Sequence, residues 1–107
     1  MFKVYFSRES SARLARYIIQ YREYYENLYR DSGIWSEDQI IDGYIAESKQ
    51  RKNEIITLIT TRLSQEVVLG KTLLNTIILP WRSKYIFLEW VEDCDSKERR
   101  IIKFDIR

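Results

Sequence analysis

The spacing of hydrophobic positions changes along the chain, and each change predicts a new element. At the N-terminus, Phe2, Val4 and Phe6 alternate with other residues, which is the two-residue period of a short strand. The next apolar side chains step by three and four instead, at Leu14, Ile18, Tyr21, Tyr25 and Leu28. This spacing is typical of one face of a helix of about five turns.

Capping signals predict where this helix and the next one begin and end. Ser7 or Ser10 can cap the first helix, and the run Asp31-Ser32-Gly33 is expected to stop it. Ser36 followed three residues later by Gln39 has the form of a capping box. A second helix therefore begins after Ser36, and the two helices form a hairpin with a short connection.

The second helix has a polar middle that allows two interpretations. Its apolar positions are Ile41, Tyr44, Ile45, Ile55, Ile56, Ile59 and Leu63. Between them, residues 47–54 are polar all round. Either the helix extends past the core at this point, or it breaks into two.

The C-terminal third has the spacing and composition of antiparallel strands. Residues 76–79 form one predicted strand, and Pro80 ends it or marks an edge or a bulge. Residues 84–91 are apolar on both faces, which predicts a central strand. A polar hairpin loop over 92–98 leads to the last strand. Its predicted faces carry Ile102, Phe104 and Ile106 on one side, and Ile101, Lys103, Asp105 and Arg107 on the other.

The pattern as a whole predicts an α+β fold in a single domain over residues 1–107. An N-terminal strand and a long helical hairpin are followed by antiparallel strands that pack on the helices, in the order β-α-α-β-β-β. The chain is 45% hydrophobic and 14% aromatic, which supplies the material for one core.

Composition excludes several classes of chemistry. There is no histidine, so the usual general base and the usual metal ligand are missing. Cys94 is the one cysteine, which allows no intrachain disulfide. We therefore expect no metal and no cofactor. No apolar run approaches a membrane span or a signal peptide, which predicts a cytoplasmic protein. The net charge of +2 does not by itself indicate a nucleic-acid binder.

Several segments resemble the RelE/ParE superfamily of bacterial toxins. The final strand pair reads 84-KYIFLEW-90, then a charged hairpin, then 101-IIKFDIR-107. The N-terminal strand 3-KVYFS-7 leads into an Ala/Arg-rich helix, 11-SARLAR-16. The resemblance covers most of the chain in architecture. It implies a toxin of a type II toxin–antitoxin system, linked to plasmid stabilisation and growth inhibition, with a cognate antitoxin as partner.

Two departures bear on which branch of the superfamily the chain resembles. In members that cleave mRNA on the ribosome, an arginine usually follows the tyrosine of the central strand, and Ile86 stands there instead. Those members also carry a short tail after the final strand, whereas this sequence stops at Arg107. The resemblance therefore favours the ParE-like branch, in which the toxin binds a protein target such as DNA gyrase.

If the chain is nevertheless an enzyme, it would be a ribosome-dependent endoribonuclease of the RelE type. RNA cleavage needs a base, an acid and stabilisation of negative charge. Without histidine, the candidate catalytic residues are Arg107, Lys103, Tyr85, Arg82 and Lys84. Their alternative role is an ordinary one, as solvated surface charges and a core tyrosine. A non-enzymatic interaction domain with the same fold is a further hypothesis.

Candidate partner-binding residues lie on both helices and at the start of the sheet. They are Tyr17, Tyr24, Trp81, Lys49, Arg51 and Lys52. Tyr17 and Tyr24 are expected to flank the apolar stripe, where exposed tyrosine would suit an interface. Trp81 could contact a partner or fill a gap between sheet and helix, and the basic cluster could bind a partner or form a solvated helix face.

Overall fold

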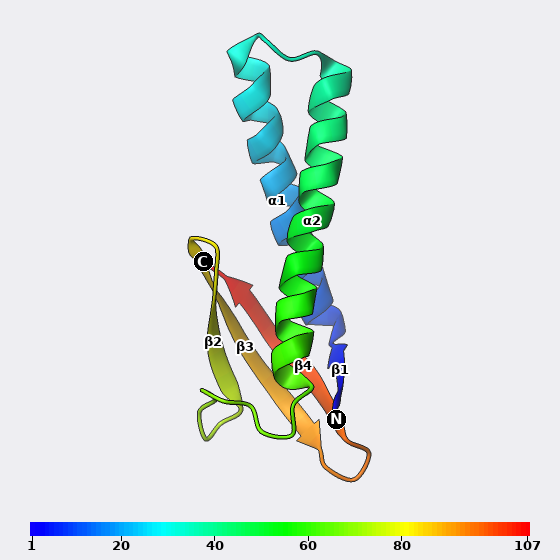
Figure 1. The fold of residues 1–107 in the computed structure, drawn as a ribbon, viewed down its shortest axis with the longest axis vertical. Helices are drawn as coiled ribbons and strands as arrows, with labels where there is room; N and C mark the ends of the chain where they lie inside the picture. Colours follow the sequence, from blue (N-terminus) through cyan, green and yellow to red (C-terminus); the bar gives the residue numbers. More distant parts are fainter.

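The computed structural model describes residues 1–107 and shows the predicted α+β architecture (Figure 1). The elements are β1 (Lys3–Phe6), α1 (Arg8–Ser32), α2 (Glu37–Leu63), β2 (Thr76–Trp81), β3 (Lys84–Asp93) and β4 (Glu98–Ile106). No helix has the combination of length and apolar character that crossing a bilayer requires.

The helix boundaries follow the capping signals in the sequence. Ser7 is the N-cap of α1, and its side chain accepts a hydrogen bond from the backbone N–H of Ser10. Gly33 ends α1 in the left-handed conformation, with φ of 70°, which a residue without Cβ adopts at low cost. At α2, the Ser36 hydroxyl accepts from the Gln39 N–H, and the Gln39 side chain accepts from the Ser36 N–H. The predicted capping box is therefore confirmed.

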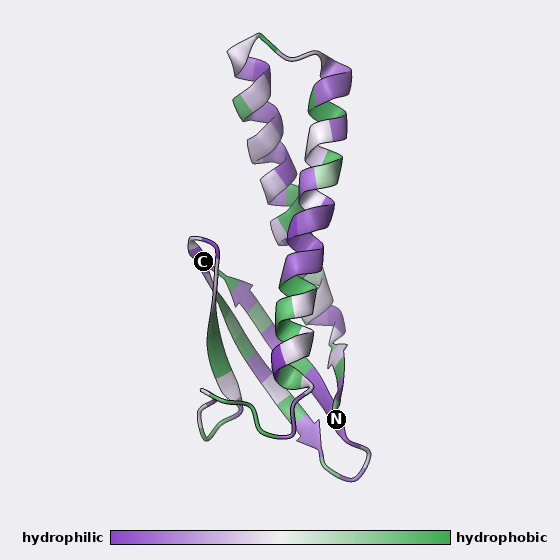
Figure 2. Ribbon diagram, in the orientation of Figure 1, coloured by the Kyte–Doolittle hydropathy of each residue, from purple (hydrophilic) through white to green (hydrophobic).

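The helical hairpin extends well past the sheet. Helix α2 is continuous, so the first of the two interpretations of its polar middle is confirmed. The molecule measures 55 × 22 × 20 Å, and the hairpin accounts for its long axis (Figure 1). Figure 2 shows that hydrophobic residues of α2 gather where it covers the sheet, with hydrophilic residues prominent beyond it. The overhang follows from this distribution, because polar faces gain nothing by packing on the sheet.

Aromatic side chains of α1 and of the helix connection pack together in the overhang. The ring centroids of Tyr25 and Tyr29 are 4.4 Å apart, and Trp35 meets Tyr29 edge-on at 5.6 Å. Gly43 lies directly under the Tyr25 phenol, and a Cβ at this position would collide with the ring. The absence of a side chain on α2 thus allows the bulky tyrosines of α1 to approach closely.

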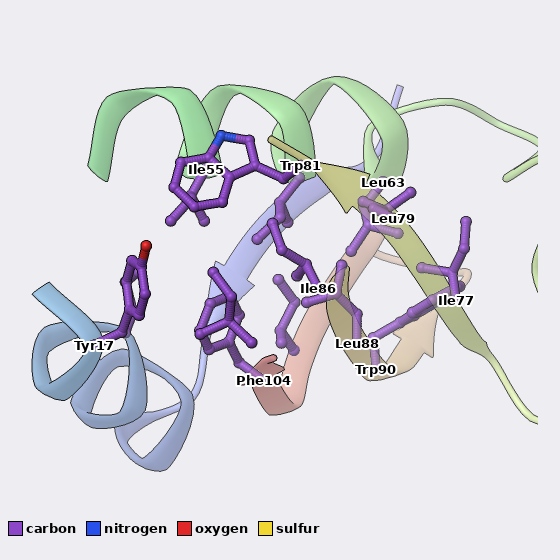
Figure 3. Packing of buried hydrophobic residues seen from close by; sticks show 14 of the residues in the cluster. Tyr17, Ile55, Leu63, Ile77, Leu79, Trp81, Ile86, Leu88, Trp90 and Phe104 are labelled. Carbon is purple, nitrogen blue, oxygen red and sulfur yellow. The ribbon is translucent and has the colours of Figure 1, made fainter. Parts of the chain in front are cut away.

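The sheet is mixed, with strand order β1-β4-β3-β2. The three C-terminal strands are antiparallel, as predicted, and β1 adds to the far side of β4 in parallel. Strand β3 is central, and Pro80 lies in the edge strand β2, where the missing N–H costs no ladder hydrogen bond. One face of the sheet packs on the helices. Figure 3 shows side chains of this core, which includes Ile55, Leu79, Ile86, Trp90 and Phe104.

A β-bulge in β4 corrects the predicted faces of the last strand. Glu89 pairs with Lys103 while Trp90 pairs with Ile101, which leaves Ile102 without a partner. The extra residue reverses the alternation. Ile101 is therefore fully buried on the core face together with Phe104 and Ile106, whereas Ile102 is only half-buried.

Arg99 is buried in the core and joins the end of α2 to the sheet. It is 2% exposed. Its guanidinium donates to the carbonyls of Leu63, at 2.6 Å, of Gln65, and of Glu66, at 3.1 Å. Leu63 is the last residue of α2, and Gln65 and Glu66 lie just beyond it, so these carbonyls have no partner within the helix. A cation at this position also interacts favourably with the helix dipole.

The same guanidinium makes two further contacts with the sheet. Its Nε pairs with Glu92 on β3 at 2.8 Å, and its plane lies 3.7 Å from the centre of the Phe2 ring. Burial acts to raise the pKa of Glu92, but hydrogen bonds from Trp90 and Arg99 outweigh it and hold the pKa below its usual range. Arg99 thus connects α2, β3 and the N-terminal segment.

We predict that Arg99→Leu destabilises the protein by about 3 kcal/mol or more, because it leaves the three carbonyls without this donor and Glu92 without its counter-charge. The free energy of unfolding in urea measures the effect. Arg100→Leu is the matched control, since Arg100 is exposed and makes no ion pair or side-chain hydrogen bond. Its expected effect is within about 0.5 kcal/mol. Equal stability of the two variants would contradict the structural role of Arg99.

Candidate binding surface on the open face of the sheet

The face of the sheet turned away from the helices exposes apolar side chains. Ile78 on β2 is 57% exposed and Tyr85 on β3 is 56% exposed, with the half-buried Phe87 between them. Ile78 and Phe87 are paired across the two strands. We call Ile78, Tyr85 and Phe87 the open-face patch. Apolar residues on both faces of β3 correctly predicted a central strand. One of these two faces, however, is turned to solvent.

A groove of about 560 Å³ runs over this face beside α1. Strand β1 pairs only with residues 98–101 of β4, so the first turns of α1 lie beside the rest of that strand. The hydroxyl of Ser10 donates to the Ile101 carbonyl at 3.1 Å, just before the bulge, and fixes the helix there. Glu9 and Arg13 therefore form one wall of the groove, and Phe87 lies in its floor.

Cations and carboxylates of the groove neutralise one another. Asp105 accepts hydrogen bonds from Arg107 Nε and from Arg13 Nη2, both at 2.8 Å. These bonds, with that of Arg107 the stronger influence, hold the pKa of Asp105 below its usual range. Lys103 pairs with Glu89 at 3.9 Å. Three basic side chains (Arg13, Lys103 and Arg107) and three acidic ones (Glu9, Glu89 and Asp105) line the groove, so its formal charge is zero.

The five candidate catalytic residues do not form one group. Tyr85, Lys103 and Arg107 share the open face, and the backbones of Tyr85 and Arg107 bond to each other in both directions. The Arg107 guanidinium lies 4.7 Å from the centre of the Phe87 ring. Arg82 and Lys84 lie at the β2–β3 turn instead, where Arg82 has a positive φ of 52°.

Arg82 is held by α2 and is not directed at the groove. It donates to Glu54 at 2.9 Å and pairs with Glu47 at 3.4 Å. Hydrogen bonds from Arg82, followed by those from Gln50 and Trp81, lower the pKa of Glu54 to about 2. The role of Arg82 is thus to attach the turn to the helix.

Three of the six candidate partner-binding residues are not exposed: Tyr17 and Arg51 do not offer the expected surface, and Trp81 has the second of its two predicted roles, filling a gap between sheet and helix. Tyr17 is 7% exposed and Trp81 is 6% exposed, and they meet edge-on in the core at 6.1 Å (Figure 3). Arg51 belongs to α2. Its side chain is 17% exposed and donates a hydrogen bond to the Tyr17 hydroxyl at 3.0 Å. Tyr17 is buried because α2 brings this arginine over it.

The other three are free to meet a partner. Tyr24 is 64% exposed, and Lys49 and Lys52 are exposed on α2. Two features of the candidate binding surface were missed in the sequence: the wall formed by Glu9 and Arg13, and the exposure of Ile78. No sequence signal identifies the first, because it depends on where the bulge fixes α1.

Comparisons with protein-family models, with curated proteins and with solved structures found no match to this chain.

We predict that acid destabilises the fold between about pH 4.5 and pH 2. The pKa of Glu54 is about 2 in the folded chain, and Lys97 with the N-terminal amine lowers that of Glu66 to about 2, against an ordinary value of 4.5. A lowered folded-state pKa stabilises the protein above the unfolded value, and this stabilisation is lost as the pH falls towards the folded value. Urea midpoints measured across this window test the expectation.

Two variants separate the ion pairs from general acid effects. Glu54→Gln should show a smaller loss of stability on acidification, because one of the responsible carboxylates is gone. Glu23→Gln changes an exposed glutamate without an ion pair. This variant should lose as much stability on acidification as the wild type does. An identical acid response in the Glu54 and Glu23 variants would contradict the assignment.

Proposed function

We propose that the protein is the toxin component of a toxin–antitoxin pair and that it acts by binding a protein target. The observation that carries this proposal is the composition of the open face, where an exposed apolar patch adjoins three cations and three carboxylates. Apolar and aromatic contacts surrounded by balanced polar groups favour protein recognition. The resemblance of the strand and helix segments to the RelE/ParE superfamily supports the toxin assignment.

The same charges argue against RNA cleavage. A nuclease of this kind needs cations that are free to stabilise the phosphate as negative charge develops. Arg107 and Arg13 are both committed to Asp105, and Lys103 is paired with Glu89. The groove offers no excess of positive charge for a polyanion, whose affinity depends on such an excess.

Expression of the gene alone in an inducible bacterial host tests the toxin proposal directly. Growth should stop, and a short neighbouring reading frame that encodes an antitoxin should restore it on co-expression. The purified protein should inhibit supercoiling by DNA gyrase and leave message and translation intact in a cell-free system. Unimpaired growth would reject the toxin proposal in favour of an interaction domain, and cleaved message would reject protein binding as the mechanism.

We predict that Ile78→Lys relieves growth arrest, because it places a charge in the open-face patch that a bound partner would desolvate. Its affinity for the target should fall by about tenfold or more. Ile19→Lys is the matched control, since Ile19 on α1 is 54% exposed and lies outside the patch. Dose–response curves of growth against inducer measure both. Equal toxicity of the two variants would show that the target binds elsewhere.

A further inference from the structure

A second cavity lies where the helical hairpin leaves the sheet. It has a volume of about 470 Å³ and is formed by one side of α1, by Arg51 of α2, by the β2–β3 turn and by the end of β4. In Figure 1 this is the region in which the hairpin rises past the end of the sheet near the C-terminus. We call it the hairpin cleft. Its volume falls within the range of small-molecule sites.

The residues that line the hairpin cleft include cations and no carboxylate, although Asp105 and Glu47 pair with its two arginines from outside the lining. The three cations are Arg13, Arg51 and Lys84. Tyr21, Tyr24, Gln20 and Ser83 add polar groups that can donate hydrogen bonds. The open-face groove, by contrast, carries three charges of each sign. The hairpin cleft is therefore equipped for an anion, and the groove is not.

The cations of the hairpin cleft retain unused donors. Arg13 gives Nη2 to Asp105, but its Nη1 is buried and has no hydrogen-bond partner. The Nε of Arg51 is likewise buried without a hydrogen bond, although Glu47 Oε1 lies 3.6 Å from it. Lys84 is half-buried and makes no ion pair or side-chain hydrogen bond. The two arginine nitrogens are closed to solvent, and both arginines pair with a carboxylate, so Lys84 is the cation of the cleft whose charge is free for a ligand.

The surroundings hold these groups in place. Arg51 is stacked 3.9 Å from the centre of the Tyr21 ring and donates to the Tyr17 hydroxyl. Burial is the main cause that raises the pKa of Tyr21, so its phenol stays a protonated donor at neutral pH. Tyr24, 64% exposed at the mouth, presents an aromatic ring on which a planar group can stack.

We propose that the hairpin cleft binds a small phosphorylated molecule of about the size of a mononucleotide, with its phosphate on Lys84. An ammonium group binds the oxygens of a phosphate through charge-assisted hydrogen bonds. The volume exceeds what a bare phosphate fills, and Tyr24 supplies stacking surface for the remainder. This site is separate from the open-face patch and does not depend on the toxin proposal.

Isothermal titration of the whole protein with three probes tests the proposal. A nucleoside 5′-monophosphate should bind, inorganic phosphate should compete with it at higher concentration, and the nucleoside without phosphate should not bind. Amide NMR shifts on titration should map to residues 20–24 and 83–84. Absence of binding, equal binding of the nucleoside, or shifts confined to other regions would overturn the assignment.

Lys84→Gln should lower the affinity for the monophosphate by about tenfold or more, because the variant loses one charged donor and keeps a polar side chain of similar length. Lys3→Gln is the matched control: Lys3 is an exposed strand lysine without an ion pair, and it should leave the affinity unchanged. Urea midpoints establish that both variants fold. A folded Lys84 variant with wild-type affinity would refute the site.

Discussion

The buried guanidinium of Arg99 is the interaction on which the arrangement of the elements depends. A helix that ends against a sheet leaves carbonyl groups without donors, and burial would make them costly. Arg99 supplies the donors from the neighbouring strand and takes its counter-charge from Glu92. Phe2 stacks on this guanidinium, and the backbone N–H of Phe2 donates to the Ser64 carbonyl at 2.9 Å. These two contacts fix the start of β1 as well.

The bulge at Ile102 makes this contact compatible with a closed core. Without the extra residue, strict alternation along β4 would turn Arg99 and Ile101 to one face and Phe104 and Ile106 to the other. With it, all four face the helices. The remaining residues of the strand's C-terminal half, Lys103 and Asp105, then face solvent together with the open-face patch. The candidate binding surface is thus a consequence of the register that the core requires.

Local signals in the sequence predicted the elements well, and long-range contacts account for what they missed. The capping box at Ser36 and the stop at Gly33 depend on neighbouring residues alone, so both were predictable. The bulge was not, since Ile101 and Ile102 are equally apolar and their order carries no sign of which one is inside. Arg99 stands in the run 97-KERR-100 and looks like a solvated charge until α2 covers it.

The candidate site was predicted in part for the same reason. Tyr85, Lys103 and Arg107 were expected together and do share the open face, because strand pairing follows from the hairpin at residues 92–98. Arg82 and Lys84 were expected with them, but the two-residue turn directs them to different surroundings: Arg82 to Glu54 on α2, and Lys84 to the hairpin cleft. Positions two residues apart at a tight turn cannot be assigned to one surface from spacing alone.

The overhang of the hairpin explains why two differently charged cavities coexist in so small a protein. Where α2 covers the sheet, apolar side chains fill the space between them, apart from Arg99 and its partner Glu92. Beyond that point the helices need polar side chains that still pack, and Arg51 between Tyr17 and Tyr21 meets both needs. Arg13 stands at the boundary and lines both cavities. Asp105 pairs with it and lines the groove, whereas Lys84 of the hairpin cleft has no carboxylate partner, and this difference separates a surface suited to a protein from one suited to an anion.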